Sequence, residues 1–201
     1  MLVNPYTKAI FMKSAAKVSQ LTEDIGAEVA FAGRSNAGKS SALNCLTNNK
    51  NLARTSKTPG RTQLINLFSI NDETHRLVDL PGYGYAKVAL QVKLDWQKNL
   101  ANYLEVRKSL KGLVVVMDIR HPLKDLDQMM IDWALNRELP VHILLTKSDK
   151  VSNSEVNRTL QGVYKHYELV PDNLLSLQVF SSTKKKGIEE LIIILNKWLN
   201  Q

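Results

Sequence analysis

Residues 33–40 place two glycines, a lysine and a serine at the spacing G-x-x-x-x-G-K-[ST], which suits phosphate binding. The apolar residues 28–32 before them indicate a buried strand, and residues 41–46 after them indicate the first turns of a helix. A strand, a glycine loop and a helix in this order direct backbone N–H groups and the helix dipole at one point. The pattern predicts a polyphosphate site that consists of Gly33, Arg34, Ser35, Asn36, Ala37, Gly38, Lys39 and Ser40.

A second phosphate-facing segment follows the strand predicted at residues 75–78. It consists of Asp79, Leu80, Pro81 and Gly82. At the carboxyl end of such a strand an aspartate can hold Mg²⁺ through water, and the Gly82 N–H can contact a γ-phosphate. Lys39 is expected to reach the outer phosphates, and the Ser40 hydroxyl is expected to bind Mg²⁺.

The identity of the base is indicated by polar residues at the ends of the last two predicted strands, 141–145 and 175–180. Guanine presents an N1–H and an N2 amino group side by side, so the Asp149 carboxylate can accept from both, a match that adenine does not offer. The stem of Lys147 would lie along the base, and a backbone N–H at residues 180–182 would contact the guanine O6. The predicted guanine site consists of Thr146, Lys147, Ser148, Asp149, Phe180, Ser181 and Ser182.

The elements that position these residues alternate between strands and helices along the chain, which favours a mostly parallel sheet with helices on both faces. The chain before residue 28 is expected to form an N-terminal extension (1–27) packed on a domain of residues 28–201. The α/β fold prediction is a six-stranded sheet with one antiparallel strand. Strands are predicted at residues 28–32, 64–70, 75–78, 112–117, 141–145 and 175–180, and helices at 41–46, 92–108, 126–136, 154–167 and 188–199.

Composition narrows the class of protein. A chain of 201 residues suits one α/β domain, and a single cysteine, Cys45, excludes an internal disulfide framework. The four histidines lack zinc-ligand spacing. No apolar run approaches the roughly 18 residues of a membrane span, so we expect a soluble, cytoplasmic protein that binds no membrane. We also expect a monomer. The net charge of +8 suits a nucleic-acid partner, and equally a merely soluble basic surface.

The ordered motifs GRSNAGKS, TPGRTQ, DLPGYG, TKSD and SSTKKKG resemble those of the EngB/YihA/YsxC family of small bacterial GTPases, in the Era/TrmE-like branch. The resemblance covers nearly the whole chain, from about Asn4 onward. It implies a Ras-like P-loop GTPase fold and Mg²⁺-dependent hydrolysis of GTP to GDP. It also implies a role in assembly of the large ribosomal subunit, through the subunit or its RNA, and a requirement for normal cell division and septation.

The resemblance also assigns a switch segment. Thr62 is implied to join Ser40 on Mg²⁺ when the γ-phosphate is present, and to act in catalysis with Lys39 and Gly82. Thr58 is the alternative for this role, but Thr62 is preferred because it lies close before the next strand. The matching residues are Gly60, Arg61, Thr62, Gln63 and Leu64.

Three positions bear on affinity and rate. Thr146 stands where most GTPases have asparagine, and we hypothesise that its shorter side chain loses a hydrogen bond to the phosphate loop, which would give moderate nucleotide affinity. Tyr83 stands where Ras-like enzymes place a water-orienting glutamine, which predicts slow intrinsic turnover with acceleration from the ribosomal particle. Asn36 matches an asparagine that in relatives helps to hold K⁺, or it serves only to shape the loop.

Three functions fit these observations, and a GTP-driven switch in ribosome assembly is favoured. A phosphotransferase would need an arginine-bearing lid and an acceptor site, which the sequence does not reveal, and residues 146–149 argue against it. A module that holds GTP without turnover is the third candidate, for which Tyr83 is the best argument.

Overall fold

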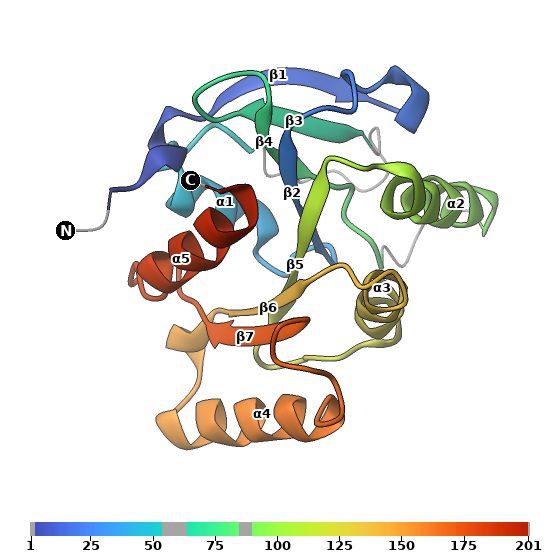
Figure 1. Cartoon of the computed structure of the whole chain (residues 1–201). Coiled ribbons are helices and arrows are strands. Elements are labelled where there is room, and N and C mark those ends of the chain that lie inside the picture. The colour runs from blue at the N-terminus through green and yellow to red at the C-terminus, as the bar shows by residue number, and fades with distance from the viewer. Residues whose placement is uncertain (1–2, 54–63, 85–89, 201) are drawn as a thin grey trace.

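The computed structural model describes residues 3–53, 64–84 and 90–200 (Figure 1). Every predicted strand and helix is present, with bounds that differ by no more than two residues from those predicted. The strands are β1 (Ile10–Ala15), β2 (Ala27–Gly33), β3 (Ile65–Ser69), β4 (His75–Asp79), β5 (Leu110–Asp118), β6 (Val141–Thr146) and β7 (Leu175–Val179). The helices are α1 (Lys39–Leu46), α2 (Leu90–Val106), α3 (Asp125–Leu135), α4 (Asn153–His166) and α5 (Ile188–Leu199).

The strands form one sheet in the order β1-β3-β4-β2-β5-β6-β7. β3 is antiparallel to both of its neighbours, β1 and β4, and the other neighbouring pairs are parallel. One antiparallel strand was predicted correctly. All parallel strands therefore end at the same edge of the sheet, where the predicted ligand-binding segments begin.

The predicted number of six strands is wrong, because residues 10–15 add a seventh at the edge beside β3. Of these residues only Ala15 is buried, and the pairing with β3 shifts register between Phe11 and Lys13. An exposed edge strand with an irregular register lacks the strict alternation of apolar and polar residues that marks a strand in a sequence.

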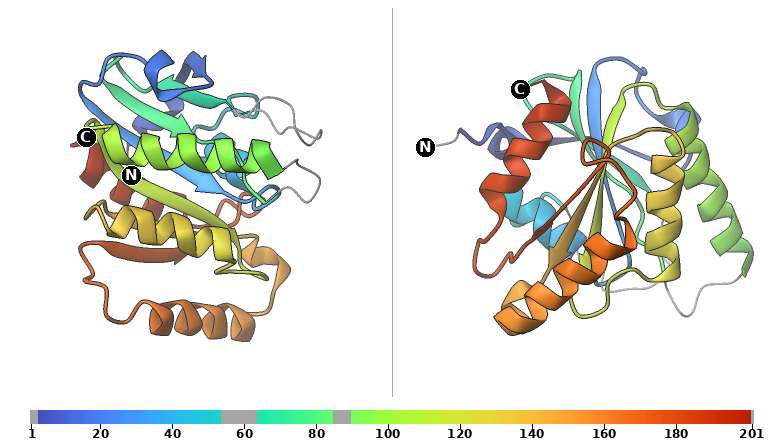
Figure 2. Two further views of the ribbon diagram at one scale, coloured as in Figure 1. Left: turned by 90° about the vertical axis from the view of Figure 1, so that its right-hand side faces the viewer. Right: turned by 60° about the horizontal axis from the view of Figure 1, so that its bottom comes forward.

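Helices cover both faces of the sheet, with α1 and α5 on one side and α2 and α3 on the other (Figure 2). Along β5, Val115 and Met117 pack in the cluster that includes residues of α2 and α3, whereas Val114 and Val116 pack in the cluster with α1 and α5. On the α5 side, a Cβ added to Gly112 would clash with the Trp198 ring, so the helix lies directly on the strand. Among the described residues, none of the helices combines the length and apolar character that crossing a membrane would need.

The N-terminal residues contact the α1 and α5 side of the molecule. Asn4 donates through its side-chain amide to the Leu46 carbonyl at the end of α1, 2.8 Å away, and the Tyr6 hydroxyl donates to Asn196 of α5 over 2.8 Å. These contacts support, as a proposal, an extension that packs on the domain. The predicted boundary at residue 27 falls within a single sheet, because the extension contributes β1 and the domain contributes the other strands.

A buried ionic network fixes the end of the sheet opposite the predicted ligand site. The fully buried Glu28 accepts from Arg76 Nε at 3.0 Å, from Arg107 Nε at 2.9 Å and from the Tyr103 hydroxyl at 2.8 Å. These partners come from β4, from the end of α2 and from the residue that follows it, so one carboxylate in β2 connects three parts of the chain.

Candidate functional site

The phosphate loop, residues 33–40, leaves the carboxyl end of β2 and runs into α1. Gly38 has φ of 95°, in the left-handed region that suits glycine, and immediately precedes the helix. Among the described residues no side chain caps α1, so its first N–H groups and its dipole face the loop. This geometry suits the anion binding that the motif predicts.

Lys39 and Asp79 meet at this edge of the sheet. The Lys39 ammonium forms an ion pair with the Asp79 carboxylate from the end of β4, and both side chains are 9% exposed. Each charge is compensated by the other, and a phosphate bound to Lys39 would leave the carboxylate to face a cation. The Ser40 hydroxyl and the Asp79 carboxylate are hard oxygen donors of the kind Mg²⁺ prefers. Within the described ranges no group of three His, Cys, Asp or Glu residues is placed so that it could hold a metal.

The segment after Asp79 is attached to the phosphate loop by its backbone. The Tyr83 N–H donates to the Gly33 carbonyl at 3.2 Å, and the Tyr83 carbonyl accepts from the Ser35 N–H at 2.7 Å. Gly82, one residue earlier, therefore lies beside the loop where a γ-phosphate contact is predicted. The structure brings Lys39, Asp79 and Gly82 together at one edge of the sheet.

The Tyr83 side chain is buried against α3. It is 2% exposed, and its hydroxyl donates to Asp127 Oδ1 of α3 over 2.7 Å. Burial raises the pKa of Tyr83 well above its usual value, so the phenol is neutral. Tyr83 occupies the sequence position at which Ras-like enzymes have a water-orienting glutamine, but its hydroxyl contacts Asp127. This contact supports the prediction of slow intrinsic turnover.

The hypothesis that Thr146 loses contact with the phosphate loop is wrong. Its hydroxyl donates to the Ala37 carbonyl in that loop and also lies 3.0 Å from the Met117 carbonyl. The short side chain reaches because Gly38 lies against it: a Cβ added to Gly38 would stand 3.2 Å from the Thr146 hydroxyl oxygen. The structural argument for moderate nucleotide affinity therefore fails.

Lys147 connects the guanine segment to the phosphate loop a second time. It has φ of 60°, and its ammonium donates to the Asn36 carbonyl at 2.7 Å. The same ammonium lies 3.0 Å from Asp118 Oδ2, and Asp118 is also paired with Arg120 at 2.7 Å. The two ends of Lys147 are thus fixed, and its aliphatic stem is left to cover a base.

The guanine carboxylate is oriented by the neighbouring strand end. The Ser181 hydroxyl donates to Asp149 Oδ1 at 2.5 Å, and the Ser148 N–H donates to the Phe180 carbonyl at 3.2 Å. The hydrogen bond from Ser181 lowers the pKa of Asp149, which keeps the carboxylate ionised. Residues 146–149 and 180–182 therefore lie together, as predicted.

A buried histidine supports the loop that contains Ser181. The Nδ1 atom of His142 in β6 lies 2.8 Å from the Ser176 hydroxyl, and its Nε2 atom lies 3.0 Å from Gln178 Oε1. Gln178 in turn donates to the Gly187 carbonyl at 2.7 Å, just before α5. Burial lowers the pKa of His142 to about 4, so the ring is neutral at pH 7.

Some predicted residues lie outside the described part of the chain: Gly60, Arg61, Thr62 and Gln63, together with the alternative Thr58. Leu64 is described and lies half-buried just before β3. Sequence reasoning missed Asp118 and Asp127. Asp118 directly follows the strand predicted at residues 112–117, which was a usable signal, whereas Asp127 resembles any acidic residue in the first turn of a helix.

Comparison with known proteins agrees with this geometry. Residues 28–147 match the family model described as a 50S ribosome-binding GTPase. A probable GTP-binding protein EngB of Mannheimia succiniciproducens is 56% identical over 97% of this chain and 94% of its own length. The corresponding protein of Enterobacter sp. is 58% identical over 97% of this chain and 93% of its own. A crystal structure of a probable GTP-binding protein EngB is similar in fold, with a TM-score of 0.70 at 23% identity over 87% of this chain and 99% of that one.

Proposed function

The chain belongs to the EngB family of GTP-binding proteins, and on that premise we propose that this GTPase is a switch in assembly of the large ribosomal subunit. The family, a GTPase family, accounts for hydrolysis of GTP to GDP. Nucleotide binding is supported above all by one observation: the phosphate loop, Gly82 and the Thr146–Asp149 segment lie close together at one edge of the sheet. The ribosomal role rests on the description of the matching family model and on the net charge of +8.

In the proposed mechanism Lys39 and the N–H groups of the phosphate loop bind the phosphates, and the Gly82 N–H contacts the γ-phosphate. Ser40, the implied Thr62 and, through water, Asp79 would hold Mg²⁺, which neutralises phosphate charge when bound. Asp149, oriented by Ser181, selects guanine. Binding of GTP draws Thr62 and Gly82 toward the γ-phosphate, and hydrolysis releases both, which is the switching step.

The proposed partner is the large subunit or its RNA, for which the positive charge provides phosphate contacts. Cytoplasmic location, a monomeric state and a requirement for cell division and septation belong to the same proposal. K⁺ is a proposed second cation beside the exposed Asn36, supplying charge that an arginine would otherwise give. A turnover rate that is unchanged when Na⁺ replaces K⁺ would exclude that role.

Hydrolysis measured with and without ribosomal subunits tests the proposal. We expect slow turnover alone and acceleration by large subunits, with binding that weakens steeply as salt is added. Small subunits at the same concentration are the matched control for nonspecific RNA. Equal rates with no subunit, small subunit and large subunit would contradict the ribosomal role while leaving GTP binding in place.

A further inference from the structure

Tyr83 joins the phosphate loop to helix α3. Its backbone exchanges hydrogen bonds with the loop: the N–H donates to the Gly33 carbonyl at 3.2 Å, and the carbonyl accepts from the Ser35 N–H at 2.7 Å. Its hydroxyl donates to Asp127 Oδ1 at 2.7 Å. The two attachments hold one residue at its backbone and at the tip of its side chain, and we refer to them together as the Tyr83 latch.

Asp127 is itself fixed in place. It is 1% exposed, and its second carboxylate oxygen accepts from the Lys124 N–H at 3.1 Å, where α3 begins. The latch therefore ends at a helix terminus. On the loop side, a Cβ added to Gly84 would lie 2.9 Å from Arg34 Nε, so the Arg34 side chain lies directly against the residue after Tyr83.

The latch acts on the residue that recognises the γ-phosphate. Gly82 precedes Tyr83 directly, so only one peptide bond separates its N–H from the Tyr83 Cα, and the N–H moves little while that residue is held. We propose that Asp127 is a positioning residue for γ-phosphate recognition: through the Tyr83 hydroxyl it holds the Gly82 N–H beside the phosphate loop. This inference rests on the proposed role of Gly82 in the GTP switch.

A second buried pair of a tyrosine and a carboxylate provides a control. It allows an effect of positioning Gly82 to be distinguished from an effect of packing. At the opposite end, the buried Tyr103 hydroxyl donates to Glu28 over 2.8 Å. In both pairs a buried tyrosine hydroxyl donates to a buried carboxylate. Burial of such a pair is by itself weak evidence that the pair stabilises the fold. Only the Tyr83 pair adjoins a phosphate-binding segment, so only its loss should distinguish GTP from GDP.

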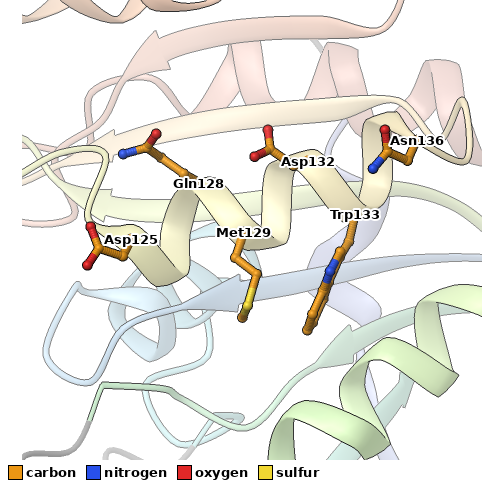
Figure 3. Close-up of a pocket in the computed structure, with 6 residues that line it drawn as sticks. All are labelled: Asp125, Gln128, Met129, Asp132, Trp133 and Asn136. Atoms are coloured by element: carbon orange, nitrogen blue, oxygen red, sulfur yellow. The ribbon is translucent and has the colours of Figure 1, made fainter.

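The helix held by the latch also forms a surface hollow. A hollow of about 480 Å³ lies along α3, and Figure 3 shows Met129 and Trp133 pointing to one side of the helix and Gln128, Asp132 and Asn136 to the other. Its polar lining comes from Asp125, Gln128, Asp132 and Asn136. Asp127 lies between the first two of these, so the latch and the hollow share the same turns of α3.

The test measures dissociation constants for GDP and for a non-hydrolysable GTP analogue in wild type, Tyr83→Phe and the matched control Tyr103→Phe. In Tyr83→Phe we expect affinity for the analogue to fall about tenfold, with GDP affinity unchanged within a factor of about two. In Tyr103→Phe the ratio of the two affinities should equal that of wild type, although a similar hydroxyl is lost. The double variant Tyr83→Phe/Asp127→Asn should be no worse than the worse single variant.

Equal loss of affinity for both nucleotides, or no loss for the analogue, would overturn the proposal. Should Tyr83→Phe fail to fold, Asp127→Asn carries the same test, because it removes the charge that the hydroxyl contacts and keeps the shape. Failure of the ribosomal proposal would be visible separately, as wild-type turnover that large subunits do not accelerate. The latch measurement contains no ribosomal component.

Discussion

The hydroxyl of Thr146, at the end of β6, donates a hydrogen bond to the carbonyl of Ala37 in the phosphate loop. The segment proposed to recognise the base is therefore attached to the segment proposed to recognise the phosphates. Lys147 makes a second attachment, to the Asn36 carbonyl. The two halves of the nucleotide site are one hydrogen-bonded unit, and loss of one attachment should weaken binding of every guanine nucleotide.

Thr146→Val tests that attachment, because valine keeps the shape and removes the hydroxyl. We expect affinity for GDP and GTP to fall together by about tenfold, since a buried carbonyl loses its donor. Fluorescent-nucleotide titration measures the effect. Thr47→Val is the control, because the buried Thr47 hydroxyl bonds, among the described residues, only to α1 carbonyls, those of Leu43 at 2.8 Å and Asn44 at 3.5 Å. Unchanged nucleotide affinity in Thr146→Val would show that the attachment is dispensable.

Asp149→Ala should abolish discrimination for guanine. The variant loses a paired acceptor that the base requires, so we expect GDP affinity to fall by at least about 100-fold. Ser181→Ala, which leaves the carboxylate and removes only the hydroxyl that orients it at 2.5 Å, should lose several-fold. Competition of labelled GDP by GTP and by ATP measures both. Competition by ATP as strong as by GTP in wild type would refute the guanine assignment.

His142 should make stability depend on pH. Its pKa falls from 6.5 to about 4 on burial, so the unfolded chain binds a proton between these values and the folded chain does not. Stability from this group is therefore complete above pH 6.5 and is lost as the pH falls toward 4, by about 3 kcal/mol in all. Urea unfolding at several pH values measures the slope.

The matched variant for this measurement is His142→Gln, which keeps a polar side chain and cannot titrate. Carboxylates with lowered pKa values also destabilise the folded state in acid, so only the difference in slope between wild type and variant reports on His142. Parallel curves between pH 6.5 and 4 would contradict the prediction.

Glu28→Gln should destabilise the fold strongly without touching the nucleotide site. The change leaves the buried guanidinium groups of Arg76 and Arg107 without their shared carboxylate, which costs about 3–5 kcal/mol. Chemical denaturation measures the loss. Glu155→Gln is the control, because that exposed carboxylate accepts from the Ser152 N–H at the start of α4 and its loss should change stability far less. A loss below that of the control would mean the network contributes little.

The sequence was most informative where strands are buried on both faces. β5 and β6 are largely apolar in sequence, and because parallel strands end at one edge, the residues after them could be predicted to form one site before the structure was known. Asp149 and Ser181 were predicted in this way to lie at one site, and the structure places them in contact. β1 was not found, because Ala15 is its only buried residue.

The contacts between segments were beyond sequence reasoning. The length of the Thr146 side chain suggested a lost hydrogen bond, but the distance that it must span depends on how closely Gly38 approaches β6. The direction of the Tyr83 side chain likewise depends on the placement of α3, which no local pattern encodes. Residue types predicted the chemistry, and packing decided which of those residues touch.

The packing of α5 has a consequence for how the protein is made. Trp198 of α5 lies against Gly112, and Asn196 of α5 accepts a hydrogen bond from the Tyr6 hydroxyl. The last helix therefore packs on a strand and on N-terminal residues that are synthesised long before it. A nascent chain would expose the phosphate loop and α1 early, yet leave that face of the sheet uncovered until residues 188–199 emerge. A prematurely terminated chain without α5 would therefore present the apolar residues of that face to chaperones and proteases.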